Sequence, residues 1–279
     1  MAASPCLVCG ATSLEPHLEF LLKCASCGFV TARLDSPTDA RALYEGAYFK
    51  GEEYLDYAAD EAFFKRNFRR RLTQVLERRQ GGRLLEIGAA YGFFLDLARP
   101  YFDVVGFEVN GEAARFGRDK FAVDIRTDDF LAVGVDDIGG PVDVTVMWDV
   151  IEHLERPDRF IEHVAAMSKP GATLHITTGD IGSLLARLRG RKWRMIHPPT
   201  HLHYFDRRTL PRLLAKYGFR TLDVRSVGVA RSFRQILYSI LVLHLRRPRA
   251  YEVLARHIPP AWGFRLNTRD IMQVTAARA

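Results

Sequence analysis

From residue 83 onward, short apolar runs alternate with stretches that have the periodicity of amphipathic helices. The apolar runs have the length of buried strands, and helical stretches of about ten residues separate them. This alternation is typical of a parallel β-sheet wrapped by helices. The sequence therefore predicts an α/β fold with a doubly wound, Rossmann-like sheet. The segments, in order, are "RLLEIG", "FFLDLARP", "DVVGFEV", "GEAARFGRDK", "VDVTVMWDV", "PDRFIEHVAAMS" and "ATLHITT".

Small residues dominate the first turn of the predicted sheet. A strand is predicted to end at Glu86, and Gly88, Ala90 and Gly92 follow it. Such residues let the main chain pass close to a ligand before the next helix begins. Glu108 comes twenty residues after Gly88, at the end of the second predicted strand. A carboxylate there can hold both hydroxyls of a ribose, so we expect a nucleoside at this edge.

The glycine spacing at this turn separates two kinds of nucleoside site. Dinucleotide-binding sheets carry Gly-x-Gly-x-x-Gly, which serves a pyrophosphate. Gly88 and Gly92 instead form Gly-x-x-x-Gly. The sequence thus favours a nucleoside without a pyrophosphate over a nicotinamide cofactor.

Four motifs together resemble those of the class I S-adenosylmethionine-dependent methyltransferases. "LLEIGAAYG" is similar to their first motif, "GFEVN" to the acidic second, "TDDF" to the adenine-contacting third and "VDVTVMWDVIEHLERP" to the fourth. The resemblance covers most of residues 83–227 and the last predicted strand, and Ala90 stands where the family usually has glycine. It implies S-adenosylmethionine as cofactor and an antiparallel last strand. The cofactor-binding residues that it implies are Glu86, Gly88, Ala90, Gly92, Glu108, Asp128, Asp129, Phe130, Trp148 and Asp149.

Each implied cofactor residue has a physical role. Glu108 would hold the ribose, and Asp128 or Asp129 would accept a hydrogen bond from the adenine amino group. Phe130 would pack on the adenine face. For the two aspartates, a solvated turn is the alternative interpretation.

Two histidines are candidates for the base that deprotonates the methyl acceptor. His153, in "WDVIEHL", follows the fourth strand and so lies at the ligand-binding carboxyl edge. His201 lies in "HPPTHLHYF", an ordered loop that resembles the acceptor loop of zinc-ribbon methyltransferases acting on sugars. The resemblance makes His201 the first candidate, with Tyr204 as a further catalytic residue, and a base with a pKa near 6.5 predicts an acid limb in the rate. Thr200 departs from this resemblance, because those relatives have a carboxylate at this position.

Other residues of that loop have plainer interpretations. His197 and His203 are expected to bond to the main chain, and Phe205 to form a wall of the pocket. The basic run "RLRGRKWR" lies just before the loop and suits either a phosphate-bearing acceptor or a solvated surface.

All four cysteines fall within the first 27 residues, as Cys6-x-x-Cys9 and Cys24-x-x-Cys27. Two such knuckles complete a tetrahedral zinc site of the ribbon type. Gly10 and Gly28 follow the second cysteine of each pair, where a tight turn is needed. Disulfides or a redox pair are the alternatives. We expect structural Zn²⁺, because four thiolates leave no open position for catalysis.

The motifs divide the chain into a zinc ribbon at 1–34, a helical linker or cover at 35–82 and a methyltransferase domain at 83–279. Phe64, Phe68, Leu72, Val75 and Leu76 predict a helix in the linker. Tyrosines at 44, 48, 54 and 57 either close over the cofactor or pack between the domains. An insertion at about 228–268 would cover the pocket, dimerise or touch a membrane.

Composition bounds the partners and the location. The formal charge of +7 favours anionic partners. The N-terminus lacks the pattern of a secretory signal and no apolar run is long enough to cross a bilayer, so a cytoplasmic location is expected.

Three functions remain open from the sequence. The leading hypothesis is methyl transfer to a small polar molecule, such as a nucleotide-linked sugar. An RNA base methyltransferase is the second, although the ribbon is poor in basic residues, so nucleic acid is disfavoured. A non-catalytic scaffold is the third, although it would be expected to lose the cofactor motifs.

Overall fold

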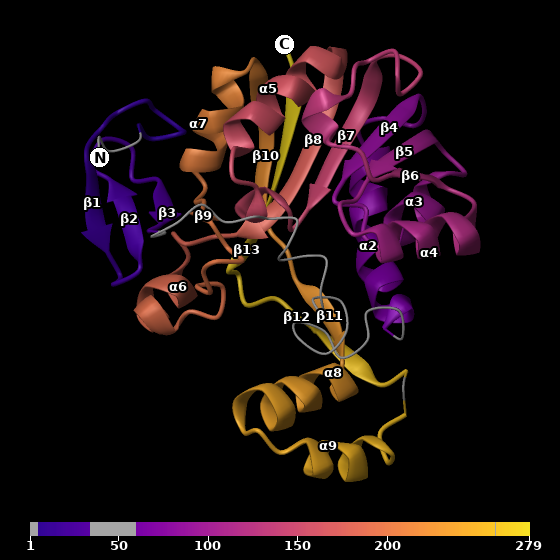
Figure 1. Ribbon diagram of the computed structural model, residues 1–279, viewed down its shortest axis with the longest axis vertical. Coiled ribbons are helices and arrows are strands. Elements are labelled where there is room, and N and C mark those ends of the chain that lie inside the picture. Colours follow the sequence, from indigo (N-terminus) through magenta and orange to yellow (C-terminus); the bar gives the residue numbers. More distant parts are fainter. Residues whose placement is uncertain (1–4, 34–59, 260) are drawn as a thin grey trace.

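The computed structural model describes residues 5–33, 60–259 and 261–279 (Figure 1). The tyrosine-rich segment at 44–57 lies outside the described residues. Within the described chain, a seven-stranded sheet forms the centre of the molecule, in the order β10-β13-β8-β7-β4-β5-β6. Its strands are β4 (Arg83–Ile87), β5 (Asp103–Phe107), β6 (Asp124–Arg126), β7 (Val142–Trp148), β8 (Ser168–Gly179), β10 (Phe219–Ser226) and β13 (Ile271–Arg278).

Strand direction in this sheet follows the sequence-based expectation. The five strands from β6 to β8 run parallel to one another. The last strand, β13, is antiparallel to both β8 and β10. The prediction of a Rossmann-like sheet with an antiparallel last strand is therefore confirmed.

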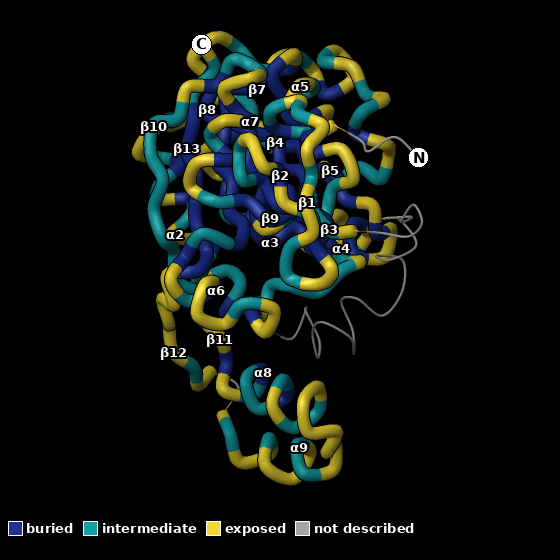
Figure 2. The backbone as a smooth tube through the Cα atoms, turned by 90° about the vertical axis from the view of Figure 1, so that its left-hand side faces the viewer, coloured by how far each residue is buried: buried dark blue, intermediate teal, exposed yellow. Residues whose placement is uncertain are grey.

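Helices cover both faces of the sheet because side chains alternate along each buried strand. Leu84 packs with α2, α3 and α4 on one face, and its neighbour Leu85 packs with α5 and α7 on the other. The buried strands fill the interior in Figure 2. The helices are α2 (Glu61–Leu76), α3 (Phe93–Ala98), α4 (Gly111–Phe121), α5 (Pro157–Met167) and α7 (Thr209–Lys216).

Helix α2 occupies part of the predicted linker, and its apolar stripe is close to the expected one. Phe68, Leu72 and Val75 are buried as predicted. Phe64 and Leu76 are half-buried and pack against the same core, and Phe63 is buried in addition.

A four-stranded sheet, in the order β1-β2-β3-β9, holds the N-terminal cysteines. β9 belongs to the segment "HPPTHLHYF" at residues 197–205, which we call the histidine loop. The sequence analysis predicted a loop there, without strand pairing. Val30 pairs with Tyr204, and Thr31 with His203. The ribbon is thereby joined to the histidine loop of the larger domain. The strands are β1 (Leu14–His17), β2 (Leu21–Cys24), β3 (Val30–Ala32) and β9 (His203–Tyr204).

An extension between β10 and β13 forms a separate lobe at the lower end of the molecule in Figures 1 and 2. We call residues 229–266 the insertion lobe. Two antiparallel strands form its stalk, and helical turns form its head. Its elements are β11 (Val229–Ser232), α8 (Phe233–Tyr238), the π-helical turn η5 (Ser239–His244), α9 (Pro248–Ala255) and β12 (Gly263–Leu266).

Short helical segments lie around the carboxyl edge of the large sheet. They are η2 (Phe130–Ala132), η3 (Ile151–His153), α6 (Leu184–Arg189) and η4 (Gly190–Lys192).

None of the helices in the described residues is long and apolar enough to span a membrane.

Candidate active site

The turn after β4 adopts the backbone conformation that its small residues permit. Gly88, Ala90 and Gly92 all have positive φ, at 75°, 47° and 73°. A Cβ on Gly88 would lie 2.4 Å from a methyl of Val150, so glycine is required there for packing as well as for conformation. Ala90 accepts this conformation at a modest energetic cost, because only glycine adopts positive φ freely.

Glu108 lies beside this turn, one residue past the end of β5. Its Oε2 accepts a hydrogen bond from the Ala90 N–H at 2.8 Å, and its Oε1 accepts one from the Asn110 N–H at 2.9 Å. Burial raises the pKa of Glu108, and these main-chain donors oppose the rise. A carboxylate has about four lone-pair sites, so acceptor capacity remains for a ligand.

Two further polar groups are buried nearby without a hydrogen-bond partner among the described residues. They are Oε2 of Glu86 and the indole N–H of Trp148. Burial raises the pKa of Glu86 well above its usual value, and the Glu108 carboxylate adds to the rise. Buried polar atoms are nearly always hydrogen-bonded, so these two are candidates for contact with a ligand or with water.

Arg71 in α2 reaches across this edge to Asp149. Its guanidinium lies 2.9 Å from Asp149 Oδ2 and stacks over Trp148, 5.0 Å from the ring centroid. The sequence analysis predicted only the apolar stripe of this helix and missed this ion pair. The signal was weak, because Arg71 is one of three consecutive arginines and only the fold shows which one faces the sheet.

The three residues predicted to contact adenine differ in their surroundings. Asp128 and Asp129 are exposed, and Asp129 caps the η2 turn by accepting a hydrogen bond from the Leu131 N–H at 3.0 Å. Phe130 is buried, with its ring 5.2 Å from that of Phe107 in an edge-on contact. This packing makes Phe130 part of the core, and Asp128 the carboxylate with more capacity for an adenine amino group.

Glu152, His153 and His201 converge although 47 residues separate the last two in sequence. One ligand atom from each lies within 4.8 Å of the other two. His153 Nδ1 bonds to the Thr200 carbonyl at 2.8 Å, and His201 Nδ1 to the Met195 carbonyl at 2.8 Å. Because a carbonyl only accepts, each Nδ1 carries the proton and Nε2 is the acceptor nitrogen in the neutral ring. The sequence analysis did not identify Glu152 as a site residue.

Burial dominates the protonation of this group. It lowers the pKa of His153 to about 4 and that of His201 to about 2, with the neighbouring histidines adding to the fall at His201. It raises the pKa of Glu152 to about 8, helped by the Asp149 carboxylate. The sequence-based expectation of a histidine pKa near 6.5 is therefore wrong for this structure, because both rings are removed from water.

The rest of the histidine loop holds these groups in place. Tyr204 is buried, and its hydroxyl donates to the His201 carbonyl at 3.0 Å. His203 bonds through Nε2 to the Glu155 carbonyl, as expected for a histidine that contacts the main chain. His197 lies against His201, with 3.8 Å between ring centroids. Tyr204 thus bonds to the backbone that carries His201.

Two members of the basic run before this loop are paired with carboxylates. Arg191 lies 2.9 Å from Glu19, and Arg194 lies 3.1 Å from the buried Asp270. The charge available for a phosphate-bearing acceptor is correspondingly smaller than the sequence suggests.

The four cysteines form a compact group in the ribbon. Sγ of Cys6 lies 3.6 Å from that of Cys27, and Sγ of Cys9 lies 3.6 Å from that of Cys24. Tetrahedral zinc with bonds of about 2.3 Å requires sulfurs roughly 3.8 Å apart, so the residues fit this ion. Gly10 and Gly28 both have positive φ, as expected for the knuckle turns.

An open depression of a different kind lies at the opposite, amino edge of the sheet. Arg83, Asp103, Asp143 and Lys169 are among its lining residues. Its charged groups largely pair with one another, as Arg83 does with Asp103 and Lys169 with Asp143. Because the depression lies at the amino edge, it is remote from the carboxyl edge, where the predicted motifs gather.

A family model described as "Methyltransferase domain" matches residues 57–224, more than half of the chain. The chain belongs to this family. The methyltransferase is thus assigned to a family of enzymes, which agrees with the motifs at the carboxyl edge and disfavours the scaffold hypothesis. The family match ends before the insertion lobe begins.

Curated relatives of the methyltransferase include two proteins named ubiquinone biosynthesis O-methyltransferase. The one from Chelativorans sp. (strain BNC1) is 29% identical over 154 residues, and the one from Brucella ovis is 30% identical over 154 residues. These matches span 52% and 53% of this chain, and 61% and 62% of the relatives. The methyltransferase therefore matches about three fifths of the length of either relative.

Solved structures show the same fold at low identity. A SAM-dependent methyltransferase from Archaeoglobus fulgidus has a TM-score of 0.54 at 19% identity, covering 86% of this chain and 100% of its own. Magnesium protoporphyrin IX methyltransferase from Synechocystis PCC 6803, with bound SAH, has a TM-score of 0.54 at 13% identity, covering 86% and 98%.

Proposed function

We propose that this methyltransferase transfers the methyl group of S-adenosylmethionine to an oxygen of a small polar acceptor. The names of the curated relatives support O-methylation, and the similar structures of a SAM-dependent methyltransferase and of a methyltransferase with bound SAH support this cofactor. The observation that carries the proposal is the convergence of Glu152, His153 and His201 at the carboxyl edge. Open α/β sheets bind their ligands at that edge.

The cofactor would bind across the ends of β4 and β5. Glu108, already held by two main-chain donors, would accept hydrogen bonds from the ribose hydroxyls. The unpartnered polar atoms of Glu86 and Trp148 would gain partners from the methionine part of the cofactor or from water. Asp128 would accept from the adenine amino group.

The acceptor would lie against the histidine loop. Its oxygen attacks the methyl carbon, and the bond to sulfur breaks with its electron pair on sulfur, which leaves as a neutral thioether. The acceptor proton passes to Nε2 of His201, or to that of His153 as the second candidate. Catalysis then consists of alignment and proton removal.

A second role for the same three residues is to hold a divalent cation. Two imidazoles and a carboxylate form a recognised donor set, and both carboxylate oxygens of Glu152 are buried without a hydrogen-bond partner among the described residues. A cation there would lower the pKa of an acceptor hydroxyl. The histidines and Glu152 would then orient the acceptor rather than carry its proton.

We propose that the four cysteines hold structural Zn²⁺. Their sulfur spacing and the knuckle turns support this ion. Metal analysis of the purified chain should give one zinc per chain, and a fully folded, zinc-free protein under reducing conditions would refute the assignment.

The decisive experiment incubates the chain with labelled cofactor and a panel of dihydroxyphenols, nucleotide-linked sugars and short RNAs, followed by mass spectrometry of the products. His201→Ala should lower turnover by about 100-fold or more while cofactor affinity stays unchanged. Chelator treatment separates the two roles, since activity lost to a chelator and restored by Mg²⁺ supports the cation. Labelled RNA without labelled small molecules would instead support the RNA hypothesis.

A further inference from the structure

We propose that the insertion lobe, together with α6 and η4, docks the methyltransferase on the surface of an anionic lipid bilayer. We call these two segments, 184–192 and 229–266, the docking face. The family match at 57–224 includes the first segment and excludes the second. The lobe's role is therefore independent of the motifs that define the cofactor site.

Exposed apolar side chains concentrate on the docking face. Fourteen large hydrophobic residues of the described chain are exposed, and eleven of them lie on these two segments. Leu184 and Leu188, on one side of α6, are 73% and 76% exposed. Large exposed apolar groups in such a concentration mark an interaction surface. The lobe contributes Phe233, Ile240, Leu243, Leu245, Val253, Leu254, Trp262, Phe264 and Leu266.

Positive charge concentrates on the same face. The lobe contains seven arginines and a single acidic residue, Glu252, a net charge of +6 against +7 for the whole chain. Segment 184–192 adds three arginines and Lys192 with no acidic residue. Among the described residues, Arg191 forms an ion pair with Glu19, whereas none of the lobe arginines forms an ion pair. Apolar groups set among basic ones are the pattern of a helix that lies on anionic lipid.

The two segments lie toward the same end of the molecule. In Figures 1 and 2, α6 lies near the lower margin of the main body and the lobe lies below it. α6 follows the end of β8, and the lobe leaves β10 after Ser226 and returns at Ile271, which pairs with Gly179 at the end of β8. The docking face therefore extends from the carboxyl edge that holds the candidate active site.

Lipid fits this surface better than the other occupants. A second copy would bring two lobes of the same high positive charge together, which electrostatic repulsion opposes. RNA would use the arginines, but it would leave aliphatic side chains such as Leu245 and Val253 without a partner. Because no helix of the described residues could span a bilayer, the contact is with its surface.

Vesicle binding by the full chain tests the proposal, and Trp262 supplies the signal. It is 61% exposed, whereas Trp148 and Trp193 are 6% and 2% exposed. With vesicles of phosphatidylcholine and phosphatidylglycerol, the chain should co-sediment and tryptophan emission should shift to shorter wavelength. Vesicles of phosphatidylcholine alone should bind far less. Trp262→Phe should abolish the spectral shift while retaining co-sedimentation.

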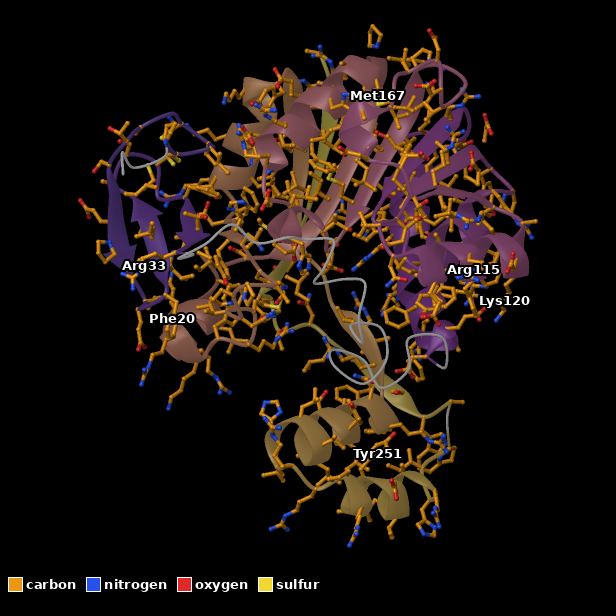
Figure 3. The ribbon with its side chains drawn as sticks, in the orientation of Figure 1. Phe20, Arg33, Arg115, Lys120, Met167 and Tyr251 are labelled. Carbon is orange, nitrogen blue, oxygen red and sulfur yellow. The ribbon has the colours of Figure 1, made fainter. Side chains whose placement is uncertain are left out.

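Two double variants and a matched control locate the contact. Arg246→Ser with Arg247→Ser should weaken vesicle binding by about tenfold or more, and so should Leu243→Ser with Leu245→Ser. The control is Arg115→Ser with Arg159→Ser, which removes the same charge from α4 and α5, away from the lobe; Figure 3 shows Arg115 on α4. It should bind vesicles as the unmodified chain does.

An equal loss of vesicle binding in the control would mean that net charge alone explains the effect, and it would overturn the proposal of a docking face. Absence of anionic-vesicle binding would also overturn it, and RNA binding lost in the lobe variants would then identify a nucleic-acid surface. Concentration-dependent dimerisation lost in the same variants, without vesicle binding, would identify a second copy as the occupant. The binding assay needs neither cofactor nor acceptor, so its failure would leave the proposed function untouched.

Discussion

Thr31 of the ribbon contacts His203 of the histidine loop, with 3.0 Å between Thr31 Oγ1 and His203 Nδ1. The same hydroxyl donates to the Leu202 carbonyl at 3.1 Å, and the Leu202 N–H donates to the Glu152 carbonyl at 2.8 Å. A continuous set of hydrogen bonds thus joins the cysteine-bearing ribbon to a member of the candidate active site. The ribbon is part of the support for the histidine loop.

Disrupting the proposed zinc site should therefore reduce turnover through the histidine loop. Cys24→Ser is expected to lower kcat by tenfold or more and to leave the affinity for S-adenosylmethionine within about twofold, because β4 and β5 belong to a different sheet from the cysteine-bearing strands. Steady-state kinetics and calorimetry measure the two quantities. Ser26→Ala, in the same knuckle but outside the cysteine set, is the control. Unchanged kcat in a zinc-free Cys24→Ser protein would show that β9 holds the loop without the metal.

Glu108→Ala should weaken cofactor binding. Hydrogen bonds from ribose hydroxyls to a carboxylate contribute about 1.5–3 kcal/mol, which corresponds to roughly 10- to 150-fold in Kd. Calorimetry with S-adenosylmethionine gives the value, and Glu162→Ala on the exposed face of α5 serves as the control. If the Glu108 variant bound the cofactor as tightly as the unmodified chain, Glu108 would be excluded from the ribose site.

The pH dependence of kcat/KM should identify the group that must be ionised. Burial lowers the pKa of His201 to about 2, so a His201 base predicts a rate that stays level from neutral pH to well below 6.5. Burial raises the pKa of Glu152 to about 8, so a requirement for its carboxylate predicts a rate that rises as pH increases through 8. Glu152→Gln would remove that rise. An acid limb centred near 6.5 would contradict both assignments.

Stability should fall in acid because of histidines buried in the neutral form. His175 lies between Thr173 and Thr275, and burial lowers its pKa to about 3. Its contribution to the free energy of unfolding is complete above pH 6.5 and is lost as pH falls toward 3, by about 1.4 kcal/mol per pH unit. The advantage of the unmodified chain over His175→Asn should thus shrink between pH 6.5 and 5 in urea unfolding. A pH-independent difference would mean that His175 is not buried neutral.

The sequence predicted the sheet because each of its parts leaves a local signal. Each of three features can be recognised from a short stretch of sequence: the apolar runs of strand length, the small-residue turn at Gly88 and the acidic residue Glu108. The knuckle glycines Gly10 and Gly28 are equally local, and both have the expected positive φ.

The parts that sequence analysis missed depend on contacts between distant residues. The pairing of Thr31 with His203 joins residues 172 apart, and neither carries a strand signal strong enough to predict it. Arg71 resembles its neighbours until the helix is placed on the sheet. The histidine pKa values also depend on burial that only the assembled loop provides, so the expected value of 6.5 failed.

The pairing of β3 with β9 has a consequence during synthesis of the chain. A ribosome makes the ribbon first, and β3 then has an unpaired edge until about 170 further residues have been added and β9 can reach it. Removing the first 33 residues to obtain a minimal enzyme would leave β9 with the unpaired edge instead. The Phe29 ring would also no longer cover Phe205. The N-terminal segment is consequently a poor place for a fusion boundary or a truncation.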